Sequence, residues 1–354
     1  MLILEIARSF YPSVGGLEKF LFDRFQMYAA LKIDYDILAT DFNTGKFDES
    51  KTNKNVRFVK QFTPYNVTPS IRKFLSTKYD FISVNQIGRF FSDYAIRWAK
   101  KNGVKIVLTP HFAFHTDKNK FIKNIIEKTI VKNGLNLSDA VICFTEVEKK
   151  YWLKLNPKIE NKTHIIPHAF IPNEVMQNEI NDDNYLLYVG RFEKNKRIDL
   201  LLQAFEKAKC NDLKLKLTIG VNELPKGLKH FTKNRNISFL GYVDNAEKVL
   251  LLKNCSALIL PSDFEAFGIV LLEASNYYKP ILCSNLEVFD DVLNSKGTIK
   301  FPNNVDGLAN ALNEFQELTL EQKREMGKIN FQNLRRFDIK IIYKMYEVMF
   351  SQIF

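Results

Sequence analysis

The chain has 354 residues, of which 46% are hydrophobic and 26% are charged. This length exceeds that of one typical domain, and the composition excludes extended disorder. No run approaches the roughly 18 apolar residues of a membrane-spanning helix, and the start MLILEIARSF has neither a basic leader region nor a small-residue cleavage site. The sequence therefore predicts a cytoplasmic protein with two domains.

The net charge of +11 is concentrated in the first half of the chain. Residues 1–174 carry 27 basic and 17 acidic side chains, whereas residues 175–354 carry 24 and 23. This asymmetry favours an anionic partner for the first half, such as a membrane surface or a lipid phosphate. A nucleic acid partner is not expected, because no zinc finger, RNA-recognition signature or basic heptad region is present.

Short runs of β-forming residues alternate with longer helical patterns, which is typical of βαβ units. Predicted helices in the first half include Leu17–Leu31 and Phe121–Leu135. The predicted strands of this half are Leu2–Ala7, Tyr35–Ala39, Val56–Val59, Phe81–Val84, Lys105–Leu108, Ala140–Phe144 and His164–Ile166.

The segment Ile166–Asn184 combines two prolines with a polar, acidic tail, a composition typical of a linker. After it the alternation restarts, with a helix at Asp199–Ala208 and a final amphipathic helix at Asp338–Phe354. The strands predicted for this half are Tyr185–Val189, Leu215–Ile219, Ile237–Leu240, Ala257–Leu260 and Ile281–Cys283.

The predicted fold class is therefore α/β, with two Rossmann-like domains in tandem. We expect one Rossmann-like domain at residues 1–170 and a second at residues 171–335. Residues 336–354 are expected to form a helix that packs across the domain boundary and returns to the N-terminal domain.

Ligands of open parallel sheets bind beyond the carboxyl ends of the strands. There, LPSDFEAFGIVLLEAS places Glu265 before a helix predicted at Ile269–Asn276 and Glu273 within it. Free N–H groups at the helix start suit a phosphate, and a glycine allows close approach of the ligand. For the spacing alone, a capped helix with two solvated glutamates remains an alternative. The residues expected to line the donor at this helix start are Ala266, Phe267, Gly268 and Ile269.

The same segment resembles the strand, E-x7-E and helix segment of glycosyltransferase family 4, and YVGRFEKNKRIDLLLQAF resembles the phosphate-binding segment of that family. The resemblance implies a GT-B fold, with parallel sheets facing a central cleft, and a retaining transferase that needs no metal. It also implies that Glu265 lies by the donor sugar, that Glu273 binds the ribose hydroxyls, and that Arg191 and Lys196 hold the diphosphate.

Arg197 stands where the family usually has glycine, so Lys194, Lys196 and Arg197 remain alternatives for the phosphate contact. The chemistry is consistent with a cationic site, because glycosyl transfer leaves growing negative charge on the departing diphosphate. Arginine and lysine side chains can stabilise that charge without a divalent metal. A strand-terminal arginine that is merely a surface charge is the alternative.

In the first half, SFYPSVGGLEKFLFDRF resembles the family's glycine loop, which implies that Gly15 and Gly16 let backbone amides approach the donor phosphates or the acceptor. An ordinary tight turn is the alternative. LTPHFAFH resembles the family's T-x-H segment, which implies that His111 lies near the donor sugar and the acceptor hydroxyl. A structural imidazole is the alternative there, and His115, four residues on, has no third metal ligand beside it.

The segment NISFLGYVDNAEKVLLLKNCSALILPS is similar to the part of the family that precedes E-x7-E. The resemblance implies that backbone groups around Tyr242 and Val243 hold the nucleotide base. Gly220 and Gly241 are expected in strand-end loops that face the same crevice.

The segment Lys118–Lys132, KNKFIKNIIEKTIVK, has a basic polar face and isoleucines on the other. Such a helix can lie on anionic lipid, which would make the protein peripheral on the inner membrane face. A surface helix packed on its own sheet is the alternative.

These patterns together predict transfer of a hexose-type sugar from UDP or GDP to a glycan or lipid-linked acceptor, in synthesis of cell-envelope polysaccharide or glycoconjugates. No cofactor or metal is expected, because the nucleotide sugar is a co-substrate. An epimerase or hydrolase of the same fold would consume the donor without an acceptor. A catalytically silent glycan-binding or partner subunit is the third hypothesis.

Overall fold

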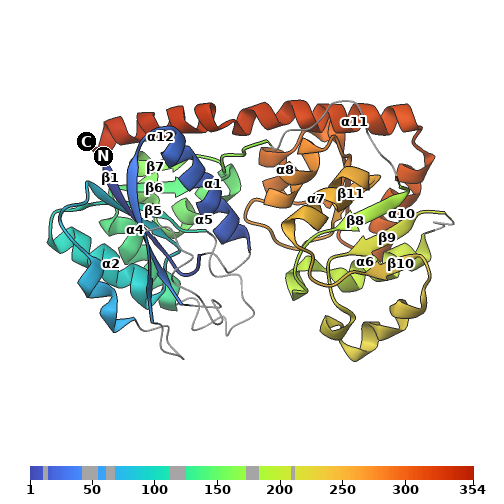
Figure 1. Ribbon diagram of the computed structural model, residues 1–354, viewed down its shortest axis with the longest axis horizontal. Coiled ribbons are helices and arrows are strands. Elements are labelled where there is room, and N and C mark those ends of the chain that lie inside the picture. The colour runs from blue at the N-terminus through green and yellow to red at the C-terminus, as the bar shows by residue number, and fades with distance from the viewer. Residues whose placement is uncertain (11–14, 42–54, 61–67, 112–124, 173–182, 209–211) are drawn as a thin grey trace. The chain divides into compact units, whose positions relative to one another are not determined.

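The computed structural model describes residues 1–10, 15–41, 55–60, 68–111, 125–172, 183–208 and 212–354 (Figure 1). The chain forms two compact units. The first unit contains Met1–Ile171 together with Phe337–Phe354, and the second contains Pro172–Arg336. Each unit is built around one parallel sheet, as expected for Rossmann-like domains.

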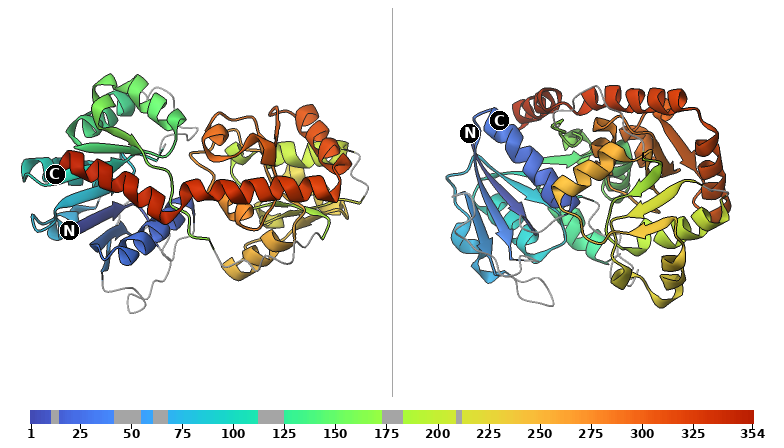
Figure 2. Two further views of the ribbon diagram at one scale, coloured as in Figure 1. Left: turned by 90° about the horizontal axis from the view of Figure 1, so that it is seen from above. Right: turned by 45° about the vertical axis from the view of Figure 1, so that its right-hand side comes forward.

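The first unit has a seven-stranded parallel sheet in the order β3-β2-β1-β4-β5-β6-β7. Its strands are β1 Leu2–Ala7, β2 Asp34–Thr40, β3 Val56–Val59, β4 Phe81–Asn85, β5 Lys105–Thr109, β6 Ala140–Cys143 and β7 Thr163–Ile165. Its α-helices are α1 Gly16–Ala30, α2 Phe90–Lys101, α4 Lys132–Leu137, α5 Glu146–Leu155 and α12 Ile339–Ile353. Both chain ends lie in this unit, and the views of Figure 2 place them close together.

The two faces of this sheet differ in chemistry because side chains alternate along a strand. Leu4 and Ile6 of β1 point into an apolar core that also contains buried residues of α2 and α4. Glu5, between them, points to the opposite face, where its carboxylate contacts Arg24 of α1. Tyr346 of α12 is buried on that second face as well and bonds to Arg24.

The second unit has a six-stranded parallel sheet in the order β10-β9-β8-β11-β12-β13. Its strands are β8 Tyr185–Tyr188, β9 Lys214–Leu217, β10 Ile237–Phe239, β11 Ala257–Leu260, β12 Ile281–Ser284 and β13 Thr298–Phe301. Its α-helices are α6 Ile198–Lys207, α7 Asn245–Asn254, α8 Ile269–Asn276, α9 Val288–Val292, α10 Val305–Glu317 and α11 Leu320–Asn333.

All twelve predicted strands occur in the structure, with ends that differ by at most two residues. The sequence analysis missed β13, an edge strand of four residues with a lysine inside it. Part of the predicted helix Phe121–Leu135, residues 121–124, lies outside the described residues. The described remainder contains a π-helical turn at Glu127–Val131, and the helix continues as α4 to Leu137.

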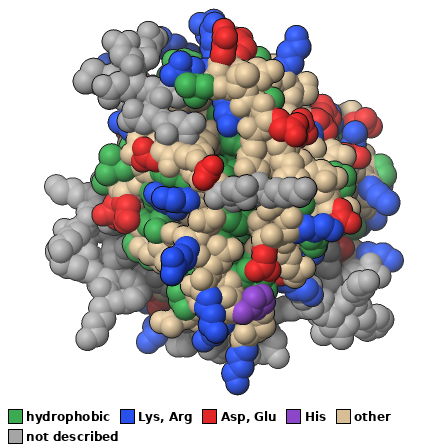
Figure 3. Space-filling view, turned by 90° about the vertical axis from the view of Figure 1, so that its right-hand side faces the viewer, with side chains coloured by type: hydrophobic (Ala, Val, Ile, Leu, Met, Phe, Trp, Pro, Cys, Tyr) green, Lys and Arg blue, Asp and Glu red, His purple; other side chains and the backbone are tan. Residues whose placement is uncertain are grey.

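Charge is mixed on the molecular face shown in Figure 3, where basic and acidic side chains lie among one another. None of the helices in the described ranges is long and apolar enough to cross a bilayer.

Asp93, in the first turn of α2, gives the first unit a pH-dependent stability. Burial raises the pKa of Asp93 to about 6, although a backbone hydrogen bond from Gly88 and the charge of Arg97 partly oppose the shift. The folded state therefore binds this proton more tightly than the unfolded chain, and stability falls as pH rises from about 4 to 6. We expect Asp93→Asn to raise the free energy of unfolding by about 1–3 kcal/mol at pH 8 and to have little effect at pH 4.

Tryptophan fluorescence can measure this effect, since Trp98 and Trp152, the two tryptophans of the chain, both lie in the first unit. Denaturation in urea at pH 4 and at pH 8 should give a gain only at the higher pH. An equal gain at both values would contradict a titrating carboxylate as the cause.

Candidate functional site

Two of the predicted site residues meet at the carboxyl end of β11 in the second unit. Lys196 Nζ lies 2.6 Å from Glu265 Oε1, and the Ser262 hydroxyl donates to the same oxygen at 2.8 Å. The side chains of Lys196 and Glu265 are 19% and 11% exposed, so both are largely sheltered from water. Residues that are 69 positions apart in sequence thus form one charged pair at the edge where the sheet is expected to bind ligands.

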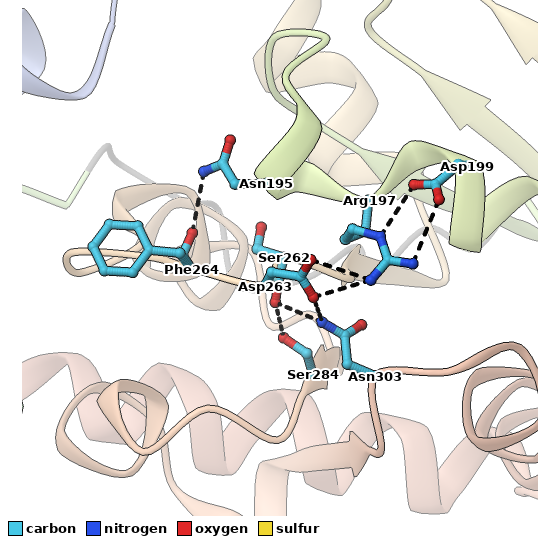
Figure 4. A network of polar contacts seen from close by, with 8 residues as sticks. All are labelled: Asn195, Arg197, Asp199, Ser262, Asp263, Phe264, Ser284 and Asn303. Atoms are coloured by element: carbon cyan, nitrogen blue, oxygen red, sulfur yellow. Dashed lines mark hydrogen bonds and ion pairs between the residues drawn. The ribbon is translucent and has the colours of Figure 1, made fainter. Parts of the chain in front are cut away.

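A hydrogen-bonded network fixes the turn that carries Glu265 (Figure 4). The Asp263 amide donates to the Asn195 carbonyl at 2.7 Å, which joins the turn to the loop that contains Lys196. The Ser284 hydroxyl, at the end of β12, donates to the Ser262 carbonyl at 2.6 Å, and the Asn303 amide also bonds to Ser262 and Asp263. The position of the Lys196–Glu265 pair is therefore set by three loops of the second unit.

Arg197 belongs to this network and is held by two carboxylates. Its guanidinium bonds to Asp199 at 3.2 Å and to Asp263 at 3.1 Å, and Figure 4 shows it between them. Its backbone has a φ of 49°, the left-handed region that glycine adopts without strain. This conformation gives a physical reason for glycine at this position in other members of the family that the sequence resembles.

The second glutamate of the motif, Glu273, is also paired with a lysine. Lys248 Nζ, on α7, lies 2.7 Å from Glu273 Oε1, on α8, and both side chains are mostly buried. The sequence analysis did not identify Lys248, because nothing within α7 indicates which neighbouring helix it faces. Both carboxylates of the E-x7-E motif therefore have a cationic partner in this structure.

The helix α8 begins immediately after Gly268, whose φ is 87°. A β-carbon at this position would lie 2.8 Å from Leu271 Cδ1. Phe267 beside it is buried, whereas Ala266 and Ile269 are partly exposed. Only glycine can therefore make this turn without strain.

Replacing Gly268 with alanine is expected to lower the free energy of unfolding by about 1–2 kcal/mol from backbone strain, with a further loss from the contact with Leu271. Gly103→Ala is a matched control, since Gly103 has a φ of 70° and open space around the added carbon. Thermal unfolding followed by circular dichroism should show a greater loss for Gly268→Ala. Equal losses of stability in the two variants would mean that the contact between the added β-carbon and Leu271 does not destabilise the protein.

Arg191 and the strand-end loops of Gly220 and Gly241 are the remaining predicted contacts of the second unit. The Arg191 side chain is 71% exposed and pairs with Glu193 at 3.0 Å, an exposed contact that a ligand can replace at little cost. The backbones of Gly220 and Gly241 pack against each other, with a φ of 77° at Gly241. Tyr242 is 78% exposed and Val243 is partly exposed, so groups of this loop are accessible.

In the first unit, His111 follows β5 at the carboxyl edge of the sheet. Its Nε2 lies 3.1 Å from Asn85 Oδ1, and its ring makes edge contacts with Phe20 and Phe144, each with 5.0 Å between ring centroids. Burial, followed by the positive charge of Arg24, lowers the pKa of His111 to about 3, so the imidazole is neutral at physiological pH. Its φ of 59° is a strained conformation of the kind found at functional sites.

Asn85 is a site residue that the sequence analysis missed, although the predicted strand ended one residue before it. His115, the other histidine of that segment, lies outside the described residues. Within the ranges that the structure describes, no group of three or more His, Cys, Asp or Glu side chains could hold a metal ion.

Gly15 precedes α1 with an extended backbone, at a φ of 174°, and Gly16 is the first residue of that helix. The Glu18 carboxylate folds back over Gly15, accepts a hydrogen bond from Ser9 at 2.5 Å, and would lie 2.7 Å from a β-carbon at that position. No described atom lies within 4 Å of a β-carbon on Gly16. A side chain at position 15 would displace Glu18, whereas Gly16 has open space beside it.

Two arginines follow neighbouring strands of the same sheet, Arg8 after β1 and Arg89 after β4. Burial, together with repulsion from Arg89, lowers the pKa of Arg8 to about 10. Two basic side chains therefore follow neighbouring strands at the carboxyl edge of the first sheet, where Glu18 partly offsets their charge.

Comparison with known proteins identifies the class. Residues 171–332 match the family model described as glycosyl transferases group 1, and residues 14–173 match the model described as Glycosyltransferase Family 4. An O-antigen chain mannosyltransferase C of Escherichia coli is 23% identical over 94% of each chain. An uncharacterised glycosyltransferase of Methanocaldococcus jannaschii is 26% identical over 97% of this chain and 96% of its own.

Among solved structures, HepE of Anabaena in complex with UDP and glucose superposes with a TM-score of 0.79 over 99% of both chains, at 17% identity. Sucrose-phosphate synthase of Thermosynechococcus elongatus superposes with a TM-score of 0.76 over 99% of this chain and 98% of its own, at 18% identity. The two parallel-sheet units and these neighbours define a glycosyltransferase with the GT-B fold. With both halves matched, the chain belongs to glycosyltransferase family 4.

Proposed function

We propose that this protein transfers a hexose from a nucleotide diphosphate sugar, UDP- or GDP-linked, to a glycan or lipid-linked acceptor during synthesis of cell-envelope polysaccharide. The observation that carries the proposal is the sheltered Lys196–Glu265 pair beside the start of α8. It puts a cation and a carboxylate beside the start of a helix, which is what a sugar linked to a diphosphate requires.

Each side chain has a role in this proposal. Lys196 leaves Glu265 and binds the diphosphate together with Arg191, while the amides near Gly268 bind phosphate oxygens. Glu265 then contacts the sugar hydroxyls, and Glu273 exchanges Lys248 for the ribose hydroxyls. The loop of Gly220, Tyr242 and Val243 holds the base through backbone groups.

The relatives support the choice of donors. HepE of Anabaena was solved with UDP-glucose as well as with UDP and glucose, and two relatives from Escherichia coli are named O-antigen chain mannosyltransferases. UDP-glucose and GDP-mannose are therefore the first donors to test. The arginines at positions 8 and 89 support an acceptor that carries a phosphate, as lipid-linked glycans do.

Retention of anomeric configuration and independence of metal are parts of the same proposal. No carboxylate is assigned as a nucleophile, so a front-face reaction, in which the departing phosphate helps to deprotonate the acceptor, is preferred over a covalent intermediate. Proton NMR of the product would show whether the new linkage has the configuration of the donor. Activity that persists in EDTA would support charge stabilisation by Lys196 and Arg191 alone.

Attachment to the membrane surface rests on the basic helix predicted at Lys118–Lys132. In its described part, Lys128 and Lys132 are exposed, Ile125 is 49% exposed and Val131 is buried. We propose peripheral binding to anionic lipid. Sedimentation with vesicles that contain phosphatidylglycerol should carry the protein down in low salt, and a Lys128→Glu, Lys132→Glu variant should stay in the supernatant.

A thermal-shift screen of nucleoside diphosphates and nucleotide sugars tests the donor assignment. A ligand that binds the native state at 100 times its Kd stabilises it by about 2.7 kcal/mol, so a true donor should raise Tm clearly. Consumption of the donor without any acceptor would favour an epimerase or hydrolase. Absence of a shift with every nucleotide would favour a catalytically silent subunit.

A further inference from the structure

A series of buried polar side chains in the first unit connects His111 to the C-terminal helix. His111 Nε2 contacts Asn85 Oδ1 at 3.1 Å, and Asn85 Nδ2 donates to Glu5 Oε2 at 2.8 Å. Glu5 Oε1 accepts from Arg24 at 3.2 Å, and Arg24 in turn donates to the Tyr346 hydroxyl at 2.5 Å. The residue His111 after β5, the strands β4 and β1, and the helices α1 and α12 thus contribute to one polar network.

These groups are costly to bury. Glu5 and Asn85 have no exposed surface, and Arg24 and Tyr346 are each 3% exposed. A buried ion pair often stabilises a protein no more than apolar side chains of the same size. Stability alone therefore does not explain why this polar network is buried. The network does, however, impose a single direction on every hydrogen bond that leads to His111.

The direction follows from the chemistry of Glu5. Both carboxylate oxygens only accept hydrogen bonds, so Asn85 must turn its amide NH2 toward Glu5, and the same NH2 reaches the Ile6 carbonyl at 3.3 Å. Its carbonyl oxygen Oδ1 then faces His111 and can only accept. His111 must therefore donate from Nε2, which leaves the lone pair of the neutral ring on Nδ1.

We propose that Glu5, through Asn85, is a positioning residue that keeps His111 in its Nε2–H tautomer and so makes Nδ1 the atom that accepts a hydrogen bond from a sugar hydroxyl. The place of that hydroxyl rests on the proposed function, whereas the tautomer itself does not. Nδ1 makes no hydrogen bond to the residues described here. The low pKa of His111 keeps the imidazole neutral, with one donor and one acceptor nitrogen. The tautomer therefore determines which nitrogen can accept a hydrogen bond.

The ring is also confined mechanically. Phe20 and Phe144 contact the ring and each other, with 5.0 Å between each pair of centroids. His168 packs against the same two phenylalanines at centroid distances of 4.7 Å and 4.1 Å. The left-handed backbone at His111 is held in place by this packing and by the bond to Asn85. Loss of the bond should therefore change the protonated nitrogen more than the position of the ring.

The Glu5→Gln variant gives a specific test. Arg24 and Tyr28 both donate to Glu5 Oε1, so the glutamine oxygen should take that place and its NH2 should face Asn85. Asn85 must then rotate to present its oxygen, which turns its own NH2 toward His111. We expect the His111 tautomer to change from Nε2–H to Nδ1–H.

Long-range proton–nitrogen NMR of the imidazole rings reads the tautomer directly in the ligand-free protein. The His111 signal is assigned by its loss in His111→Gln, and Asp139→Asn, a carboxamide substitution in the same unit outside this network, is the control. Wild type and Asp139→Asn should both show a pyrrole-like Nε2, and Glu5→Gln a pyrrole-like Nδ1. A wild-type Nδ1–H ring, or a folded Glu5→Gln protein with unchanged shifts, would overturn the proposal.

If Glu5→Gln fails to fold, Asn85→Leu serves instead, because it removes the acceptor and should give a mixture of both tautomers. A single unchanged Nε2–H form in that variant would equally refute the role of Asn85. In transfer assays of Glu5→Gln we expect kcat/KM for the donor to fall about tenfold, the effect of losing one hydrogen bond to the sugar. Correct tautomers without donor binding would refute the proposed function and leave this inference intact.

Discussion

Replacing Lys196 with alanine should reduce kcat for glycosyl transfer by about 10²–10³-fold, the cost of removing one group that stabilises developing negative charge. The lysine lies at 2.6 Å from Glu265 and is sheltered from water, so its charge acts strongly on a diphosphate bound nearby. Donor consumption measured with saturating acceptor gives kcat, and a thermal-shift titration gives the affinity for the nucleoside diphosphate.

Arg197→Ala separates two of the three cations that the sequence left as alternatives, Lys196 and Arg197. Because Arg197 is held by Asp199 and Asp263, its loss should loosen the turn and lower Tm without reducing kcat to the same extent. Lys207→Ala is a neutral control, since that lysine forms an exposed pair with Asp306. A greater loss of kcat in Arg197→Ala than in Lys196→Ala would reverse the assignment.

Arg24→Met should lower the free energy of unfolding of the first unit by about 3–5 kcal/mol, because it leaves the Glu5 carboxylate buried without its cation. Tryptophan fluorescence in urea follows this unit by itself, since both tryptophans belong to it. The midpoint should shift to lower urea with little change in slope.

The double variant Glu5→Gln, Arg24→Met should recover a large part of that loss, because neither charge of the buried Glu5–Arg24 pair remains. A double variant as unstable as the sum of the two single variants would show that the two groups do not interact. This double-mutant cycle therefore measures the interaction energy of the Glu5–Arg24 pair, and not only the cost of leaving one buried charge without its partner.

The sheet strands could be predicted well because each is a short apolar run that ends at a turn signal, as in Ala257–Leu260 before Pro261. The E-x7-E segment was informative for a similar reason, since α8 begins at Ile269 both in the sequence pattern and in the structure. Local patterns of this kind specify where an element starts and which residues follow it.

Contacts between residues that are far apart in the chain could not be predicted from local sequence patterns. Nothing in α7 shows that Lys248 faces Glu273, and nothing near Asn85 shows that Glu5 determines its orientation. Arg197 is a further case, because arginine does not favour its left-handed backbone and its partner Asp263 lies 66 positions further along the chain. The roles of Arg191, Lys196, Glu265, Glu273 and His111 stay predictions that the experiments above address.

The assignment of Phe337–Phe354 to the first unit has a consequence for biosynthesis. Ile342, Tyr346 and Met349 of α12 are buried there, and Arg24 and its partner Tyr346 are 322 positions apart in the chain. The packing of the first unit is therefore completed only after the whole second unit has been translated. While the ribosome makes the second unit, Arg24 lacks its hydrogen bond to the Tyr346 hydroxyl. The apolar side chains that α12 covers in the folded protein are then exposed to solvent. The nascent first unit therefore needs protection until α12 has emerged from the ribosome.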